Sequence, residues 1–232
     1  MMNYYGTDQY KEYVKKLDEQ VFSKTKFREP DRVKELESGY CIKFYFYEDK
    51  DNCKPGYAPA SGEICRLYHN GRMVFEWKNK YEKTRMAKII HHADGNSYLV
   101  FTEDLYGYSV LNLDTLDCLH YIPAESYGSY PGDFEETFIW CDCFYQPETN
   151  LLAVEGCIWA CPYDVIVLDF SHPMVAVEAA QWFAINENCR DDSSDWFDLE
   201  FAAWKGRTLV CKSLGEKPKG FHIDGKCDVE FV

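Results

Sequence analysis

Tyr108-Ser-Val-Leu-Asn-Leu-Asp114 recurs 55 residues later as Tyr163-Asp-Val-Ile-Val-Leu-Asp169. An apolar stretch precedes each copy, Tyr98-Leu-Val-Phe101 in the first case and Leu151-Leu-Ala-Val154 in the second, at an offset of 53. A two-residue insertion in the intervening loop would reconcile the two offsets. Similarity at a fixed period is typical of repeat proteins, so these stretches decide the fold class.

Four strand-like runs are expected in each repeat, over residues 86–122 and 138–182. Runs with strand-like length and composition outside the quoted stretches are Tyr40–Phe46, Glu63–Tyr68, Arg72–Trp77, Met86–His92, Cys118–Ile122, Phe138–Tyr145, Val175–Trp182, Phe197–Ala203 and Thr208–Lys212. Turn signals such as Asn70-Gly71 and Asp94-Gly95 separate neighbouring runs and predict antiparallel pairing. Residues 40–77 and 196–232 look like degenerate copies of the unit. The sequence therefore predicts a mainly β, antiparallel, propeller-like protein, with an open propeller or a curved β-sandwich as alternatives.

The N-terminal sequence predicts an amphipathic helix rather than a strand. Thr7 can cap a helix over residues 8–22 in which Tyr10, Val14, Leu17 and Val21 share one face. Two parts are expected, an N-terminal helical segment over residues 1–35 and a β-repeat domain over residues 36–232.

Asn150-Leu-Leu-Ala-Val-Glu-Gly156, followed by Tyr163-Asp-Val-Ile-Val-Leu-Asp-Phe170, resembles the second and third strands of a WD40-type propeller blade. The Gly-His and Trp-Asp signatures of that family are absent from this chain. The whole chain also resembles uncharacterised bacterial proteins. The resemblance implies a binding or scaffolding role.

Composition excludes several classes of protein. The 232 residues are 46% hydrophobic and 17% aromatic, which excludes an intrinsically disordered chain. No apolar stretch approaches the roughly 20 residues of a membrane span, and the first 16 residues lack the apolar core of a secretory signal. The eleven cysteines are an odd number, as expected for free thiols in a reducing compartment. We therefore expect a cytoplasmic protein.

Charge is distributed unevenly. The chain has 25 Lys and Arg against 39 Asp and Glu, a net charge of −14. From Ile89 to Cys189 there are 16 acidic residues and no Lys or Arg. Such a surface repels nucleic acid and anionic lipid and attracts basic groups. The expected partner is therefore a protein, basic in character, with neither nucleic acid nor membrane as a ligand.

Common catalytic motifs are absent. The sequence contains no phosphate-binding glycine loop, no dinucleotide fingerprint, no G-x-S-x-G elbow and no H-E-x-x-H pair, so no cofactor is expected. Cys141, Cys143, Cys157 and Cys161 lack the spacing of a zinc knuckle and are interpreted as ordinary thiols. Because adjacent strand residues point to opposite faces, His91-His92 cannot both serve one site. No metal site is predicted.

The densest acidic run is Asp191-Asp-Ser-Ser-Asp-Trp-Phe-Asp-Leu-Glu200. It lacks the glycine turn of an EF-hand and is interpreted as a solvated loop that leads into a strand, with a weak cation site as the alternative. Asp198 and Glu200 fall on one strand face, as a pair of catalytic carboxylates would.

The candidate binding site follows from the repeat. At the 53-residue offset Tyr106 aligns with Trp159, and Glu103 and Glu155 lie close to them in the sequence. Equivalent loops of neighbouring blades emerge at one end of the molecule, so these residues predict an aromatic and acidic rim. The alternative is that both aromatic rings pack under their own loops.

The loop at residues 124–133 is rich in Tyr, Ser and Gly, and its Tyr127 and Tyr130 are expected to join the rim.

The first hypothesis for function is a non-enzymatic module that binds a protein through this rim. One specific version is an immunity-type inhibitor of a basic toxin such as a nuclease. The alternative is a hydrolase or lyase on a carbohydrate or small polar substrate, with Glu103, Glu155 or the pair of Asp198 and Glu200 as acid and base.

Overall fold

A computed structural model of the chain describes residues 3–23, 28–53, 56–80, 86–127, 136–188, 198–214 and 226–230. Tyr127, Asn188, Leu214 and residues 226–230 are described by their backbone alone. None of the helices in these ranges has the length and apolar character needed to cross a membrane.

Four antiparallel sheets follow one another along the chain. The first contains β1 (Arg32–Glu35), β2 (Tyr40–Glu48), β3 (Ser61–His69) and β4 (Arg72–Asn79). The second contains β5 (Ala87–His91), β6 (Ser97–Phe101), β7 (Tyr108–Asn112) and β8 (Cys118–Tyr121). The third contains β9 (Ile139–Gln146), β10 (Leu151–Cys157), β11 (Asp164–Asp169) and β12 (Phe183–Ala184). The fourth contains β13 (Asp198–Lys205), β14 (Thr208–Leu214) and β15 (Lys226–Glu230).

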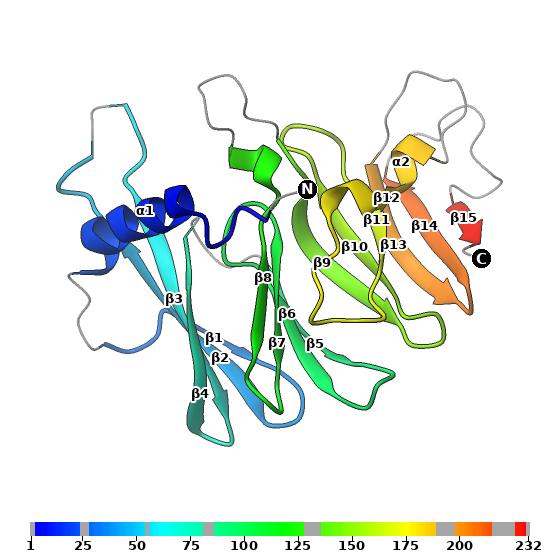
Figure 1. Ribbon diagram of the computed structural model, residues 1–232, viewed down its shortest axis with the longest axis horizontal. Helices are drawn as coiled ribbons and strands as arrows, with labels where there is room; N and C mark the ends of the chain where they lie inside the picture. The colour runs from blue at the N-terminus through cyan, green and yellow to red at the C-terminus, as the bar shows by residue number, and fades with distance from the viewer. Residues whose placement is uncertain are drawn as a thin grey trace.

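The sheets stand side by side in chain order, with the first and fourth at opposite ends of the long axis (Figure 1). Every strand pairs with its neighbours in sequence, so each sheet is a meander. This confirms the predicted mainly β, antiparallel and propeller-like repeat, and the four sheets form an open array.

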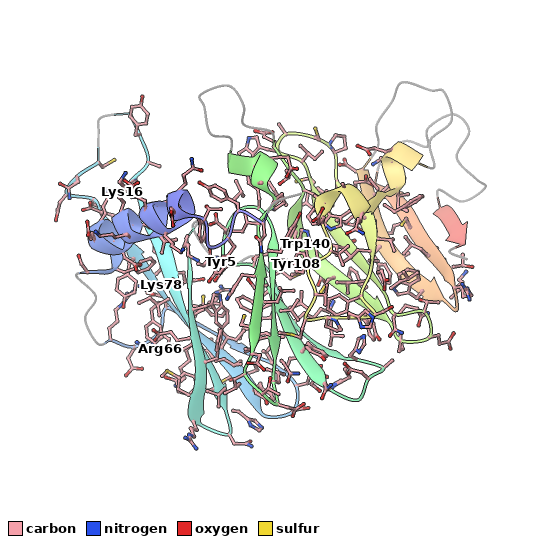
Figure 2. The ribbon with its side chains drawn as sticks, in the orientation of Figure 1. Tyr5, Lys16, Arg66, Lys78, Tyr108 and Trp140 are labelled. Atoms are coloured by element: carbon pink, nitrogen blue, oxygen red, sulfur yellow. The ribbon has the colours of Figure 1, made fainter. Side chains whose placement is uncertain are left out.

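Apolar side chains fill the space between neighbouring sheets. The core between the first two sheets includes Ile42, Phe44, Leu67, Leu99, Phe101 and Leu111. The core between the second and third includes Val100, Tyr108, Val110, Trp140, Leu152 and Val154. The core between the third and fourth includes Ala153, Val165, Val167, Leu199, Leu209 and Cys211. Each inner sheet is covered by a neighbouring sheet on both faces. Its strands therefore carry apolar side chains at consecutive positions, which point in turn to one neighbour and to the other. Figure 2 shows Tyr108 and Trp140 together at the middle junction, where their rings stack with centroids 4.4 Å apart.

The predicted N-terminal helix is present as α1 (Asp8–Leu17), which continues as a π-helical turn, η1 (Asp18–Phe22). Thr7 caps it by accepting a hydrogen bond from the Tyr10 N–H, as the sequence indicates. Leu17, Val21 and Phe22 pack on Tyr45 and Ile64, which covers part of the outer face of the first sheet. Upstream of the helix, Asn3 forms a β-bridge with Pro123 at the edge of the second sheet.

Hydrogen-bond register corrects one part of the predicted repeat. Tyr98 pairs with Asn112 in the second sheet, and Ala153 pairs with Val167 in the third. Both residues of the second pair therefore lie 55 positions after those of the first. A single offset relates the two hairpins, and the two-residue insertion expected from the sequence does not exist.

The strand predicted over Val175–Trp182 is also wrong. This segment follows a turn that the Val175 N–H closes on the His172 carbonyl oxygen, and it contains the 3-10 helix η3 (Ala179–Gln181). The fourth strand of the sheet is the two-residue β12. The Val177 N–H donates to the Tyr108 hydroxyl and the Ala179 N–H to the Tyr121 hydroxyl, both at 2.9 Å. Because side chains of the second sheet satisfy these backbone groups, the segment has no need of a strand partner.

Candidate functional site

An aromatic and acidic surface lies where the third and fourth sheets meet. We call it the acidic rim and define it by residues from β9, β10, β13 and the loop between β10 and β11: Asp142, Glu155, Trp159, Tyr163, Asp198 and Glu200. All six lie at the end of the sheets that the β10–β11 loop occupies, or on the strands that lead to it.

The loop over residues 158–163 presents the two aromatic rings. Trp159 is 50% exposed and Tyr163 41% exposed, and both belong to the few large apolar side chains of the described chain that face solvent. The Cys161 N–H closes a tight turn on the Ile158 carbonyl oxygen at 2.9 Å, and Ala160 within it has a φ of 61°. A positive φ is unfavourable for alanine, so surrounding contacts hold this loop in its shape.

Two carboxylates of the rim, those of Glu155 and Asp198, accept hydrogen bonds from backbone donors. Glu155 lies opposite Asp142 in the register of β10 and β9, and its Oε1 accepts a hydrogen bond from the Phe201 N–H at 2.5 Å. Asp198 Oδ1 accepts a hydrogen bond from the Tyr163 N–H at 2.8 Å. These bonds connect the third sheet to the first strand of the fourth, so the two sheets hold the carboxylates in one geometry.

Two cations reach the rim from its edges. Lys88 Nζ lies 2.9 Å from Asp142 Oδ1, and Lys212 Nζ lies 2.7 Å from Glu200 Oε2. Four carboxylates are thus matched by two lysines. The rim keeps a net negative charge, which a cationic ligand would neutralise.

Electrostatics sets Glu155 apart from the other rim acids. Burial raises the pKa of Glu155, the Phe201 N–H partly offsets that effect, and the charges of Glu200 and Asp142 raise the pKa further. The free energy of the ionised Glu155 carboxylate is therefore raised, and a cation placed beside it would lower that free energy.

Two of the predicted rim residues are interior instead. Glu103 and Tyr106, in the loop between β6 and β7, are 6% and 3% exposed. Glu103 lies 3.0 Å from His120 Nδ1 and 3.4 Å from Lys80 Nζ, inside a buried charged cluster. The common 55-residue offset explains the difference from Trp159, because it makes Asp104 the counterpart of Trp159 and Cys161 the counterpart of Tyr106.

Other predicted residues lie at the limits of the described chain. Tyr127 ends the 3-10 helix η2 (Ala124–Tyr127), and its backbone alone is described. Tyr130 lies outside the described residues, as does the acidic run up to Phe197. Asp198 and Glu200, which end that run, alternate along β13 as predicted.

The cysteine and histidine pairs have ordinary surroundings. Cys157 lies opposite Ile139 rather than Cys141, and burial raises the pKa of the Cys143 thiol to about 12. His91 is exposed beside Ser97, whereas His92 is buried with its ring nitrogen 2.9 Å from the Phe170 carbonyl oxygen, so the two rings point apart. Within the described ranges, no group of three or more His, Cys, Asp or Glu side chains could hold a metal ion.

Sequence reasoning missed Asp142 and Tyr163. Asp142 lies in the strand that precedes β10, which makes it a possible neighbour of Glu155. A bulge between Glu155 and Gly156 decides which residue of β9 pairs with Glu155, and the sequence does not show that bulge. Tyr163 opens the second copy of the repeat, and nothing in its sequence neighbourhood distinguishes an exposed ring from a buried one.

Comparisons with protein-family models, with curated proteins and with solved structures find no match to this chain.

Proposed function

We propose that this protein is a non-enzymatic binding module whose acidic rim recognises a basic segment of a partner protein. The observation that carries the proposal is the half-exposed ring of Trp159 in the same rim as Glu155, whose ionised form is disfavoured by burial and by neighbouring carboxylates. An exposed tryptophan beside unbalanced negative charge suits an arginine side chain, which stacks on aromatic faces and pairs with carboxylates.

The distribution of charge supports the same class of partner. The rim belongs largely to the stretch from Ile89 to Cys189, which has no Lys or Arg of its own. A basic partner would be attracted over a distance and would associate faster at low salt. The likeness to WD40-type blades favours a binding or scaffolding role, and the odd number of cysteines favours a reducing, cytoplasmic setting.

A second candidate is favoured by one observation. The raised pKa of Glu155 is a property that a general acid requires, so a hydrolase or lyase acting at the rim is the alternative function. Turnover of a carbohydrate or small polar substrate that is lost in Glu155→Gln, with no affinity for basic peptides, would favour the enzyme over the binding module.

The binding proposal is tested with a fluorescent arginine-rich peptide and its citrulline counterpart, which has the same shape and no charge. Fluorescence anisotropy at two ionic strengths should show binding of the arginine peptide that weakens with salt. Trp159→Ala should weaken it by about tenfold or more, as loss of an aromatic anchor does. Val175→Ala, which removes an exposed apolar side chain from another loop, should leave it unchanged.

Charge specificity needs a second pair of variants. Glu155→Gln should weaken binding and reduce its salt dependence, whereas Asp114→Asn removes an equal charge from the exposed β7–β8 turn and should do neither. Equal effects of these two substitutions, or equal affinity for the citrulline peptide, would show that the rim is not the binding site.

A further inference from the structure

The first strands of three sheets form a second polar feature, which is separate from the aromatic part of the rim. Lys34 on β1 donates a hydrogen bond to the Ala87 carbonyl oxygen on β5 at 2.8 Å. Lys88 on β5 in turn reaches Asp142 on β9 at 2.9 Å. Lys88 pairs with Val100 across strands β5 and β6, and Asp142 pairs with Glu155 across strands β9 and β10. Since Glu155 lies 55 positions after Val100, Lys88 and Asp142 occupy equivalent positions in the two sheets.

A cavity of about 490 Å³ opens along these strands, which we call the axial cavity. Its lining includes Lys34, Lys88 and Asp142, and the apolar part is supplied by Met86, Ala87 and Ile89, which are 2%, 3% and 8% exposed. A concave site of this volume, apolar at its base and with a few charged groups, is typical of small-molecule binding.

Charge is unbalanced around Lys34. Among the described residues no carboxylate lies within ion-pair distance of its ammonium group, which bonds instead to a backbone carbonyl. Lys34 lies on the same face of its sheet as the buried Ile42, toward the second sheet. Desolvation lowers the pKa of Lys34, and the charges of Arg32 and Lys88 lower it further, although Asp142 opposes them. An anion beside Lys34 would supply the missing counter-charge.

From this geometry we infer that the axial cavity binds a small organic monocarboxylate. The carboxylate group accepts hydrogen bonds from the ammonium groups of Lys34 and Lys88, and the apolar body lies against Met86 and Ile89. Glu37, which lies 3.3 Å from His91 Nε2, adds a second carboxylate to the lining beside that of Asp142. That charge disfavours a second anionic group on the ligand, which selects monoanions.

Calorimetric titration with hexanoate tests the inference, with 1-hexanol and inorganic phosphate as comparison probes. Hexanoate should bind, and Lys34→Met should weaken it by about tenfold or more, as loss of a charge-assisted hydrogen bond does. Lys43→Met is the matched control, because Lys43 lies on the neighbouring strand β2 and points to the opposite face of the sheet.

Asp142→Asn provides the opposite effect. It removes the carboxylate that competes for Lys88, so hexanoate should bind more tightly, whereas the basic peptide of the previous proposal should bind less tightly. These opposed results distinguish the axial cavity from the acidic rim.

Cysteine alkylation gives an independent readout that does not depend on variants. Cys141 lines the axial cavity, and the exposed Cys161 lies outside it. Saturating hexanoate should slow the reaction of Cys141 with iodoacetamide and leave Cys161 unaffected. The inference is overturned if hexanol binds as well as hexanoate, if phosphate binds and hexanoate does not, or if Lys34→Met binds hexanoate as the parent protein does.

Discussion

A carboxylate oxygen of Glu103 lies 3.0 Å from Nδ1 of His120, in the interior between the second sheet and residues 3–7, which precede α1. Lys80 approaches the same carboxylate at 3.4 Å, and the ring of Tyr5 stacks on the His120 imidazole with centroids 4.3 Å apart. The Tyr10 hydroxyl donates to Asp104 in the same loop as Glu103. One cluster thus joins Lys80 after the first sheet, the second sheet, Tyr5 before α1 and Tyr10 within α1.

Substitution of Glu103 should destabilise the protein. Glu103→Gln leaves Lys80 and His120 without a buried counter-charge, and the free energy of unfolding should fall by about 3 kcal/mol at neutral pH. Burial alone would raise the pKa of Glu103, but the charges of Lys80 and His120 lower it below the usual 4.5. The stabilisation by ionised Glu103 is therefore complete above pH 4.5, and it is lost as the pH falls through the pKa of Glu103 in the folded state. Urea unfolding at neutral pH and at a pH below the folded-state pKa of Glu103 measures this difference, with the exposed Glu35→Gln as control. A pH-independent difference would contradict the coupling.

Ionised Asp164 should destabilise the folded protein, whereas ionised Glu103 stabilises it. Burial raises the pKa of Asp164 from 3.8 to about 6, although the Val165 and Asn186 N–H groups donate to it. Its ionised form therefore costs on the order of 3 kcal/mol at neutral pH, and that cost disappears as pH falls from about 6 to below 3.8. Asp164→Asn should be more stable than the parent at neutral pH and lose that advantage at acid pH. Paired denaturant titrations check this. A parent protein that does not gain stability relative to the variant on acidification would show that Asp164 titrates normally.

Gly156 should not tolerate a side chain. A Cβ at this position would lie far inside van der Waals contact with the Ile139 carbonyl oxygen, where β9 and β10 approach at the bulge. Gly156→Ala should reduce the free energy of unfolding by at least about 2 kcal/mol. Gly71→Ala separates this clash from backbone strain, because Gly71 has a φ of 80° with open space around it. It should cost only about 1 kcal/mol. Equal losses in thermal unfolding would rule out the close approach as the cause.

Tyr108 and Tyr121 should control the segment before β12. Their hydroxyls accept the N–H groups of Val177 and Ala179, so the double substitution to phenylalanine should cost about 1 kcal/mol for each bond lost. Hydrogen exchange should accelerate at these two amides. Tyr57→Phe, which alters a hydroxyl on a side chain that is 74% exposed, should change neither quantity. Unchanged exchange in the double variant would mean that other contacts hold the segment.

Much of the fold could be predicted from the sequence because apolar periodicity and turn residues are local. The capped helix from Thr7 and the repeat shared by Val110 and Val165 depend on neighbours within a few residues. The offset error has a physical cause. A shift of two residues returns every strand side chain to the same face, so apolar patterning does not distinguish 53 from 55. Hydrogen-bond register does, and it follows from long-range pairing.

The candidate site could be predicted only in part, for a related reason. Glu155 and Trp159 lie at the rim, but Tyr106 and Glu103 are enclosed beside an N-terminal segment that is distant in sequence, since Tyr10 of α1 reaches Asp104 from 94 residues away. The pairing of Glu155 with Asp142 depends on a bulge that has no clear mark in the sequence. Burial of a polar loop is thus a tertiary property.

The open array also implies an order of opening. The second and third sheets are sandwiched by neighbours, and the first has α1 and η1 on its outer face (Figure 1). The fourth sheet packs on the third through a single described core. In a linear array with nearest-neighbour coupling, a terminal unit secured on one side opens at the smallest free-energy cost. Local unfolding should therefore begin at β13 and β14 and advance toward the N-terminus. The acidic rim, which contains residues of β13, should lose its structure before the axial cavity does.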